Sequence, residues 1–103
     1  MGIDELLKGR REEILRIAEK HGARNLRVFG SFARGEARPD SDVDFLYARG
    51  LRRTQFFPGG LVSDLEELLA RPVQVVNENA LHPLIRERVL SEAVPVCMKE
   101  LGA

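Results

Sequence analysis

Residues 30–45, GSFARGEARPDSDVDF, combine residue types that can hold a phosphate and a metal ion. The Gly-Ser pair, Gly30 and Ser31, directly follows an apolar run, and two aspartates, Asp42 and Asp44, come later at a spacing of two. Residues at i and i+2 of a strand point to the same face of a sheet, roughly 6.6 Å apart along the strand. Two carboxylates that share a face in this way indicate a cation between them.

Gly30 and Ser31 have the features of a phosphate cradle. Glycine admits positive φ and lets a ligand approach the backbone closely, and Ser31 offers a hydroxyl and backbone N–H groups where a helical turn is predicted to begin. Ten residues, 32 to 41, separate Ser31 from Asp42, which is enough for a helical turn and a return loop. The cradle and the carboxylates are then expected to be neighbours, as Mg²⁺-dependent phosphoryl chemistry requires.

Each half of this pattern also has a structural explanation. A Gly-Ser pair is a common turn, and Asp-x-Asp often occurs at exposed strand ends, so either alone favours a structural role. The combination is more specific, with Arg34 and Gly35 between the halves and Ser41 before the first aspartate. Arg34 has two interpretations, because a guanidinium that holds a triphosphate and one in an exposed salt bridge look the same in sequence.

The rest of the chain predicts alternating helices and strands around this segment. Hydrophobic periodicity predicts helices over 4–20 and 82–92. A further helix is predicted to begin at Ser63, with Glu66 as its capping-box partner. Strands are predicted over 25–30, 42–48 and 73–76, and an apolar tail follows at 94–98. In the second strand one face carries Asp42, Asp44 and Leu46, and the other carries Val43, Phe45 and Tyr47. The short loop between the first two strands predicts an antiparallel pair in one α/β (α+β) domain over residues 1–103.

Composition excludes several classes of function. Sixteen basic and sixteen acidic residues give a net charge of zero, which argues against direct nucleic-acid binding through overall charge. There is no apolar run of roughly 20 residues to span a bilayer, and the charged N-terminus does not resemble a signal peptide. A single cysteine, Cys97, cannot form an internal disulfide. We therefore expect a cytoplasmic protein without membrane contact.

The segment from Gly30 to Gly35, followed by Ser41-Asp42-Val43-Asp44-Phe45, resembles the signature of the minimal nucleotidyltransferases, the smallest members of the DNA polymerase beta superfamily. The resemblance covers nearly the whole chain, including residues 81–88, which are similar to the family's last helix. It implies a mixed sheet flanked by helices, with ATP or another NTP as substrate. The implied site residues are Asp42 and Asp44 for catalysis and Mg²⁺, and Gly30, Ser31, Arg34 and Ser41 for the nucleotide.

The same resemblance implies a partner protein. Proteins like this are typically encoded beside a HEPN-domain protein, as a toxin and antitoxin pair in which the nucleotidyltransferase adds AMP to the partner or binds it. One departure from the family pattern concerns Gln74, which stands where a later strand of the superfamily carries a third carboxylate. An amide oxygen is a weak metal ligand and cannot act as a base. Glu78, four residues on, would reach the site only if the strand ended early.

Two hypotheses follow from these residues. The first is an enzyme that transfers a nucleoside monophosphate to an acceptor hydroxyl on a partner protein, and the intact Gly-Ser and Asp-x-Asp elements favour it. The second is a catalytically degenerate module that neutralises its partner by binding, and Gln74 favours it.

Overall fold

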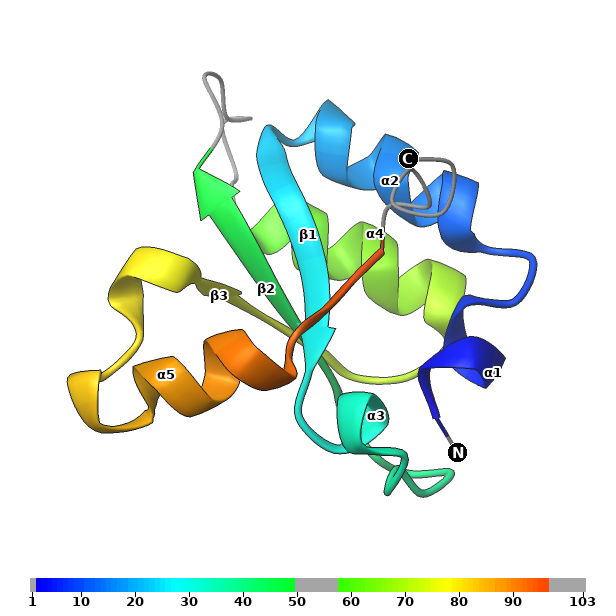
Figure 1. Cartoon of the computed structure of the whole chain (residues 1–103). Helices are drawn as coiled ribbons and strands as arrows, with labels where there is room; N and C mark the ends of the chain where they lie inside the picture. Colours follow the sequence, from blue (N-terminus) through cyan, green and yellow to red (C-terminus); the bar gives the residue numbers. More distant parts are fainter. Residues whose placement is uncertain (1, 50–57, 97–103) are drawn as a thin grey trace, which may run out of the picture.

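The computed structural model of the chain describes residues 2–49 and 58–96. Cys97 and the end of the predicted apolar tail lie outside this range. The elements, coloured along the sequence in Figure 1, are α1 (Ile3–Leu7), α2 (Arg11–Lys20), β1 (Ala23–Phe29), α3 (Ser31–Arg34), β2 (Val43–Arg49), α4 (Gly59–Leu69), β3 (Val73–Asn77), a 3₁₀ turn (Glu78–Ala80), α5 (Pro83–Glu92) and β4 (Val94–Pro95).

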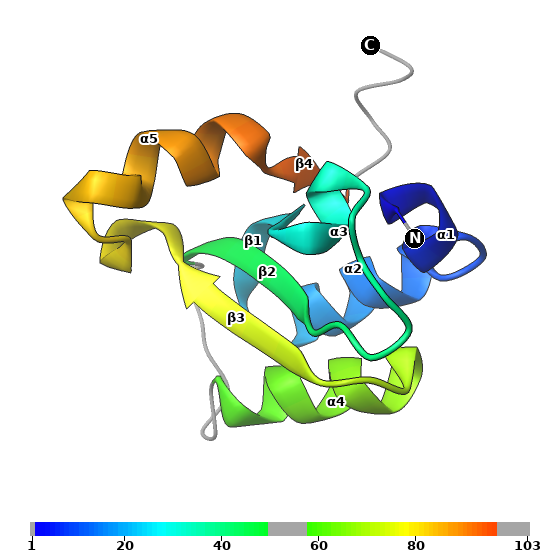
Figure 2. The same cartoon turned by 90° about the horizontal axis from the view of Figure 1, so that it is seen from below.

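The four strands form a mixed sheet in the order β3-β2-β1-β4. β1 pairs antiparallel with β2, as the short loop between them predicts, and β1 also pairs antiparallel with β4. β2 and β3 are parallel, because α4 carries the chain back across the sheet. Figure 2 shows α2 and α4 against one face of the sheet and α5 over the other. The expected mixed sheet flanked by helices is therefore confirmed.

The alternation predicted for β2 is present and decides which side chains leave the core. Val43, Phe45 and Tyr47 are buried in the main hydrophobic cluster, together with Ile14 of α2 and Leu65 of α4. The opposite face of the same strand carries Asp44, which is half-buried, and Leu46, which is fully buried. Because alternate residues of a strand point to opposite faces, the packing of the core face holds Asp44 on the face below α5.

The single helix predicted over 4–20 is wrong, because the chain breaks it into α1 and α2. Gly9 lies between the two helices with φ +73°, a left-handed conformation that only glycine adopts readily. Hydrophobic spacing continues across the break, since Leu6 and Leu7 of α1 and Ile14 of α2 are all buried. Periodicity alone therefore did not reveal the turn.

The predicted helix start at Ser63 is also wrong, because α4 begins at Gly59. The extra turn buries Leu61 completely, and Gly60 allows α4 to pack close to His21, where an added Cβ would lie 2.8 Å from His21 Cε1. Glu66 is not a capping-box residue; its carboxylate accepts a hydrogen bond of 3.0 Å from the Val73 N–H and so connects α4 to β3.

Asp64 of α4 gives a pH-dependent contribution to stability. The hydrogen bond from buried His21, with 2.8 Å between Nε2 and Oδ2, lowers the pKa of the Asp64 carboxyl below its ordinary value. The unfolded chain therefore binds this proton more readily than the folded chain. The contribution is fully present above the ordinary pKa of about 3.9 and is lost as the pH falls through the lower folded-state pKa.

We accordingly expect Asp64→Asn to lose less of its free energy of unfolding than the wild type does between pH 6 and pH 3, measured by urea unfolding. The exposed Glu67 of the same helix provides the control variant, Glu67→Gln. Equal losses in the wild type and Asp64→Asn would contradict the assignment of this pair.

Candidate functional site

Gly30 connects the end of β1 to the start of α3 in a conformation that other residues rarely adopt. Its dihedral angles are φ +78° and ψ −151°, in a region accessible essentially only to glycine. A Cβ built on Gly30 would lie only 2.3 Å from Oδ2 of Asp44. The sequence predicted that a ligand approaches the backbone at this glycine; in the structure the side chain that approaches it is the Asp44 carboxylate.

The two aspartates converge at this point. β1 and β2 place Asp44 directly opposite Phe29, the residue before Gly30, while Asp42 is exposed and immediately precedes β2 rather than lying inside it as predicted. Partial burial raises the pKa of the Asp44 carboxyl above its ordinary value; the negative charge of Asp42 raises it further, and Arg34 opposes the shift. A cation between the two carboxylates would relieve this repulsion.

Gln74 stands beside Asp44 in the sheet. The parallel register of β2 and β3 pairs the two residues, so their side chains project from the same face on neighbouring strands, about 4.8 Å apart at the backbone. The predicted alignment of position 74 with the Asp-x-Asp strand is therefore confirmed. Glu78 does not replace the missing carboxylate, because it forms an ion pair with Arg27.

The remaining predicted residues lie around these carboxylates. Ser31 is the first residue of α3 and is half-buried. The Ser41 hydroxyl accepts a 2.7 Å hydrogen bond from the Arg38 N–H and so closes the loop that leads into Asp42. The Arg71 guanidinium donates to the Ser41 carbonyl oxygen at 3.2 Å. In this structure the Ser41 hydroxyl therefore organises the loop that presents the carboxylates.

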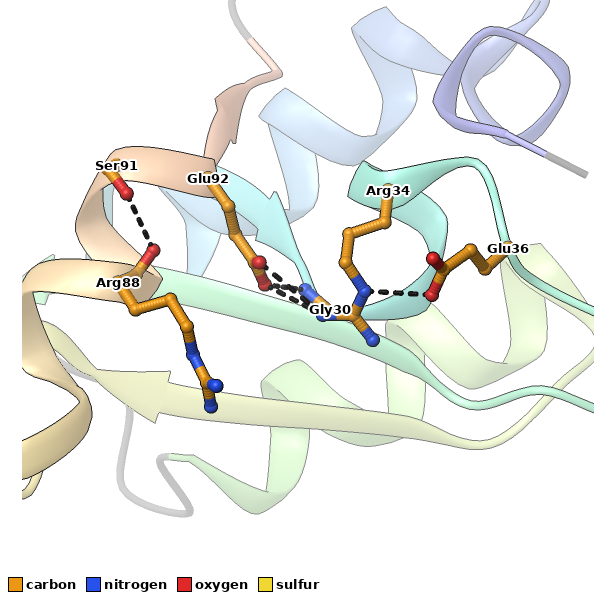
Figure 3. A network of polar contacts seen from close by, with 6 residues as sticks. All are labelled: Gly30, Arg34, Glu36, Arg88, Ser91 and Glu92. Atoms are coloured by element: carbon orange, nitrogen blue, oxygen red, sulfur yellow. Dashed lines mark hydrogen bonds and ion pairs between the residues drawn. The ribbon is translucent and has the colours of Figure 1, made fainter.

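Arg34 forms the salt bridge that one of its two sequence interpretations describes, and its partner Glu92 was not predicted. The Arg34 guanidinium donates to Glu36 through Nε at 2.9 Å and to the Glu92 carboxylate at 3.2 and 3.4 Å, and these carboxylates raise the pKa of Arg34. The Gly30 N–H donates to the same Glu92 carboxylate at 2.9 Å. Figure 3 shows Glu92 extending from the end of α5 to both donors. Glu92 is 58 positions beyond Arg34, so no local spacing reveals the contact.

The site thus places two carboxylates next to a Gly-Ser turn and a guanidinium. Within residues 2–49 and 58–96 there is no cluster of three or more His, Cys, Asp or Glu side chains arranged to hold a metal ion. A pair of carboxylates is nonetheless sufficient for Mg²⁺, which usually takes one or two protein carboxylates and completes its shell with water and substrate phosphates. Asp42 and Asp44 fit that requirement.

A family model described as "Nucleotidyltransferase domain" matches residues 11–96 of the chain, a range that includes every element of this site. The chain belongs to this family. This nucleotidyltransferase-family chain is 36% identical to the protein adenylyltransferase MntA of Thermococcus cleftensis, over 91% of this chain and 92% of that protein. The resemblance to minimal nucleotidyltransferases is thereby confirmed.

Solved structures support the same assignment. A protein assigned as a minimal nucleotidyltransferase is 49% identical, with a TM-score of 0.77 over 88% of this chain and 93% of that chain. The tri-AMPylated Shewanella oneidensis HEPN toxin in complex with its MNT antitoxin gives a TM-score of 0.64 at 12% identity, over 92% of this chain and 75% of that chain. At that identity the likeness concerns the fold. In the described part of this nucleotidyltransferase, no helix is long and apolar enough to cross a membrane.

Proposed function

We propose that this protein transfers AMP from ATP to a hydroxyl group on a HEPN-domain partner and thereby acts as an antitoxin. The observation that supports the proposal is the contact geometry of Gly30 and Asp44, in which a carboxylate lies against the Gly-Ser turn of a member of the nucleotidyltransferase family. The relative named protein adenylyltransferase supports AMP transfer to protein. The MNT and HEPN complex of similar fold supports the class of partner.

The binding roles follow from the chemistry of the residues at the site. The backbone N–H groups at Gly30 and Ser31 and the Arg34 guanidinium supply hydrogen-bond donors for phosphate oxygens. Ser41 lies on the loop that leads into Asp42, and its hydroxyl, which accepts from the Arg38 N–H, keeps a proton to donate to a phosphate oxygen. Asp42 and Asp44 would hold Mg²⁺, which in such a site neutralises charge on the transferring phosphoryl group and promotes attack by the acceptor hydroxyl.

Transfer of AMP forms a bond between the acceptor oxygen and the α-phosphorus, breaks the bond to the β-phosphate and releases pyrophosphate. The acceptor hydroxyl must lose its proton, which passes to water. Gln74 lies beside Asp44 but takes no proton at neutral pH, so it contributes an amide oxygen and no base. We therefore expect slower transfer than a third carboxylate at this position would support.

The absence of a carboxylate at position 74 also favours a second candidate function, in which the protein neutralises its partner by binding alone. A growth assay separates the two. The HEPN-domain protein that we expect to be encoded nearby is expressed with either the wild type or the Asp42→Asn, Asp44→Asn double variant. Growth restored by the wild type and lost with the double variant supports the enzyme. Equal growth with both forms supports the binding module and would contradict AMP transfer as the basis of neutralisation.

Gln74→Asp tests the missing carboxylate directly. Because residue 74 lies beside Asp44, the substitution adds a hard oxygen ligand and a base. It also adds a negative charge to a site where the pKa of Asp44 is already raised. We expect at least about tenfold faster transfer of label from α-labelled ATP to the partner. The melting temperature should fall in chelator and recover as Mg²⁺ is added.

Gln74→Glu is the control for charge, because glutamate adds the same negative charge as aspartate on a side chain that is one methylene longer. A Gln74→Asp variant whose melting temperature does not respond to Mg²⁺ would contradict a metal site at Asp42 and Asp44.

A further inference from the structure

Glu92 places an anion on the donors that line the cradle. It is the last residue of α5, and its side chain is only 19% exposed. One of its oxygens, Oε2, accepts from the Gly30 N–H at 2.9 Å and from the Arg34 guanidinium at 3.2 Å. The carboxylate therefore joins a backbone donor and a side-chain donor that are four positions apart in sequence, at the turn between β1 and α3 (Figure 3).

We propose that Glu92 is an internal competitor for the phosphate of the nucleotide, so that the substrate binds only when the Glu92 carboxylate leaves the Gly30 N–H and the Arg34 guanidinium. The proposal rests on the proposed function, since it assigns those two donors to phosphate. In this role Glu92 sets the affinity for the nucleotide without taking part in the transfer reaction.

The competition follows from the chemistry of the two anions. Carboxylate and phosphate oxygens both accept charge-assisted hydrogen bonds, and the same N–H group and guanidinium nitrogen serve either one. Glu92 also lies close enough to Asp44 for its negative charge to act on that carboxyl. A phosphate group placed beside Glu92 would face Asp42, Asp44 and Glu92 together, and like charges at close range oppose binding. Occupation by both anions is therefore unfavourable.

Glu36 provides an internal comparison. It also pairs with Arg34, at 2.9 Å from Nε, but its side chain is 66% exposed, and no hydrogen bond connects it to Gly30 among the described contacts. Solvent screens such an exposed ion pair strongly. Glu36 therefore orients the guanidinium from outside, whereas Glu92 occupies both donors from the cradle side.

The contact can open by rotation of the Glu92 side chain. Glu92 is the last residue of α5, close to the buried Val89, and β4, which begins two residues later, pairs with β1. The backbone at this end of α5 is therefore held in place. The side chain keeps 19% exposure, so a rotation toward solvent is sufficient to free the Gly30 N–H.

Glu92→Gln tests the proposal, because it keeps the size of the side chain and an amide oxygen for the Gly30 N–H while removing the negative charge. Inorganic tripolyphosphate is titrated calorimetrically into the full chain in the presence of Mg²⁺ at fixed ionic strength, since it offers phosphate without a base or sugar. We expect about tenfold tighter binding than in the wild type, or about 1.4 kcal/mol. Glu87→Gln, which removes an exposed negative charge from the same helix, is the matched control, with a change of less than about twofold.

Glu92→Asp serves as a second variant if Glu92→Gln does not fold by circular dichroism. It keeps the charge but shortens the side chain by one methylene, so it also withdraws the carboxylate from Gly30 and should tighten binding. Unchanged or weaker binding in the folded variant would overturn the proposal and make Glu92 a brace for the turn. Absence of tripolyphosphate binding in every form would overturn it too, because the freed donors would then take no anion.

Failure of the proposed function gives a different result. In that case Glu92→Gln binds tripolyphosphate more tightly than the wild type, but neither form transfers AMP from ATP to the HEPN partner.

Discussion

The double substitution Asp42→Asn with Asp44→Asn is expected to abolish Mg²⁺-dependent ATP binding while leaving the fold intact. The two asparagines keep the shape of the side chains but remove both charges that would hold the cation. A loss of at least about a hundredfold in affinity corresponds to about 2.7 kcal/mol. Calorimetric titration with ATP in the presence of Mg²⁺ gives the affinity, and circular dichroism verifies that the variant is folded.

The same variant should be more stable than the wild type in the presence of chelator. Burial and the charge of Asp42 raise the pKa of Asp44 in the folded protein, so the folded state holds this proton more tightly than the unfolded chain does. The ionised carboxylate therefore destabilises the fold at neutral pH, and this destabilisation disappears as the pH falls through the raised pKa to the ordinary value of about 3.9.

Urea unfolding in chelator should accordingly show the stability advantage of the double variant at pH 7, and a smaller advantage at pH 4. An ATP affinity in Mg²⁺ that does not change would contradict the metal site. A stability advantage that grows on acidification would contradict the charge repulsion.

Gly30→Ala should remove nucleotide binding through geometry rather than charge. The added methyl group would lie 2.3 Å from Oδ2 of Asp44, so the carboxylate must turn away from the position it takes beside the cradle. The positive φ of +78° adds backbone strain of about 1–3 kcal/mol. We expect a folded but less stable protein in which ATP binding in Mg²⁺ falls by at least about tenfold.

Gly35 offers a matched control for this experiment. It has a similar φ of +75°, but nothing lies within 4 Å of an added Cβ. Gly35→Ala should lose less free energy of unfolding than Gly30→Ala, because Gly35 lies in the left-handed region that Ala70 of this chain also adopts, and it should retain its affinity for ATP. If both variants lose nucleotide affinity equally, backbone strain alone accounts for the effect, and the contact between Gly30 and Asp44 has no role in binding.

Features coded by local spacing were predicted from the sequence. The alternation of Val43, Asp44, Phe45 and Leu46 depends only on the period of a strand, and it gave the correct face for the carboxylate. The alignment of Gln74 with Asp44 followed from the family resemblance, in which the matching strand carries a third carboxylate, and it is present in the parallel register. Gly30 was recognised because a close approach to the backbone requires a residue without a side chain.

Features that depend on tertiary packing were missed. Glu92 contacts the cradle only because α5 folds over the sheet, and its place at the end of a helix carries no signal of that contact. The first helical turn of α4, from Gly59, forms despite the low helix propensity of glycine. It forms because Leu61 is buried and Gly60 packs close to His21. Local propensity is a weak guide where burial on the core decides the outcome.

AMP transfer is tested most directly by the intact mass of the HEPN partner after incubation with this protein, ATP and Mg²⁺. We expect a gain of one or more AMP units on the partner with the wild type, and no gain with the Asp42→Asn, Asp44→Asn variant or in chelator. An unmodified partner in a stable complex with the folded wild type would contradict AMP transfer and leave binding as the function of this protein.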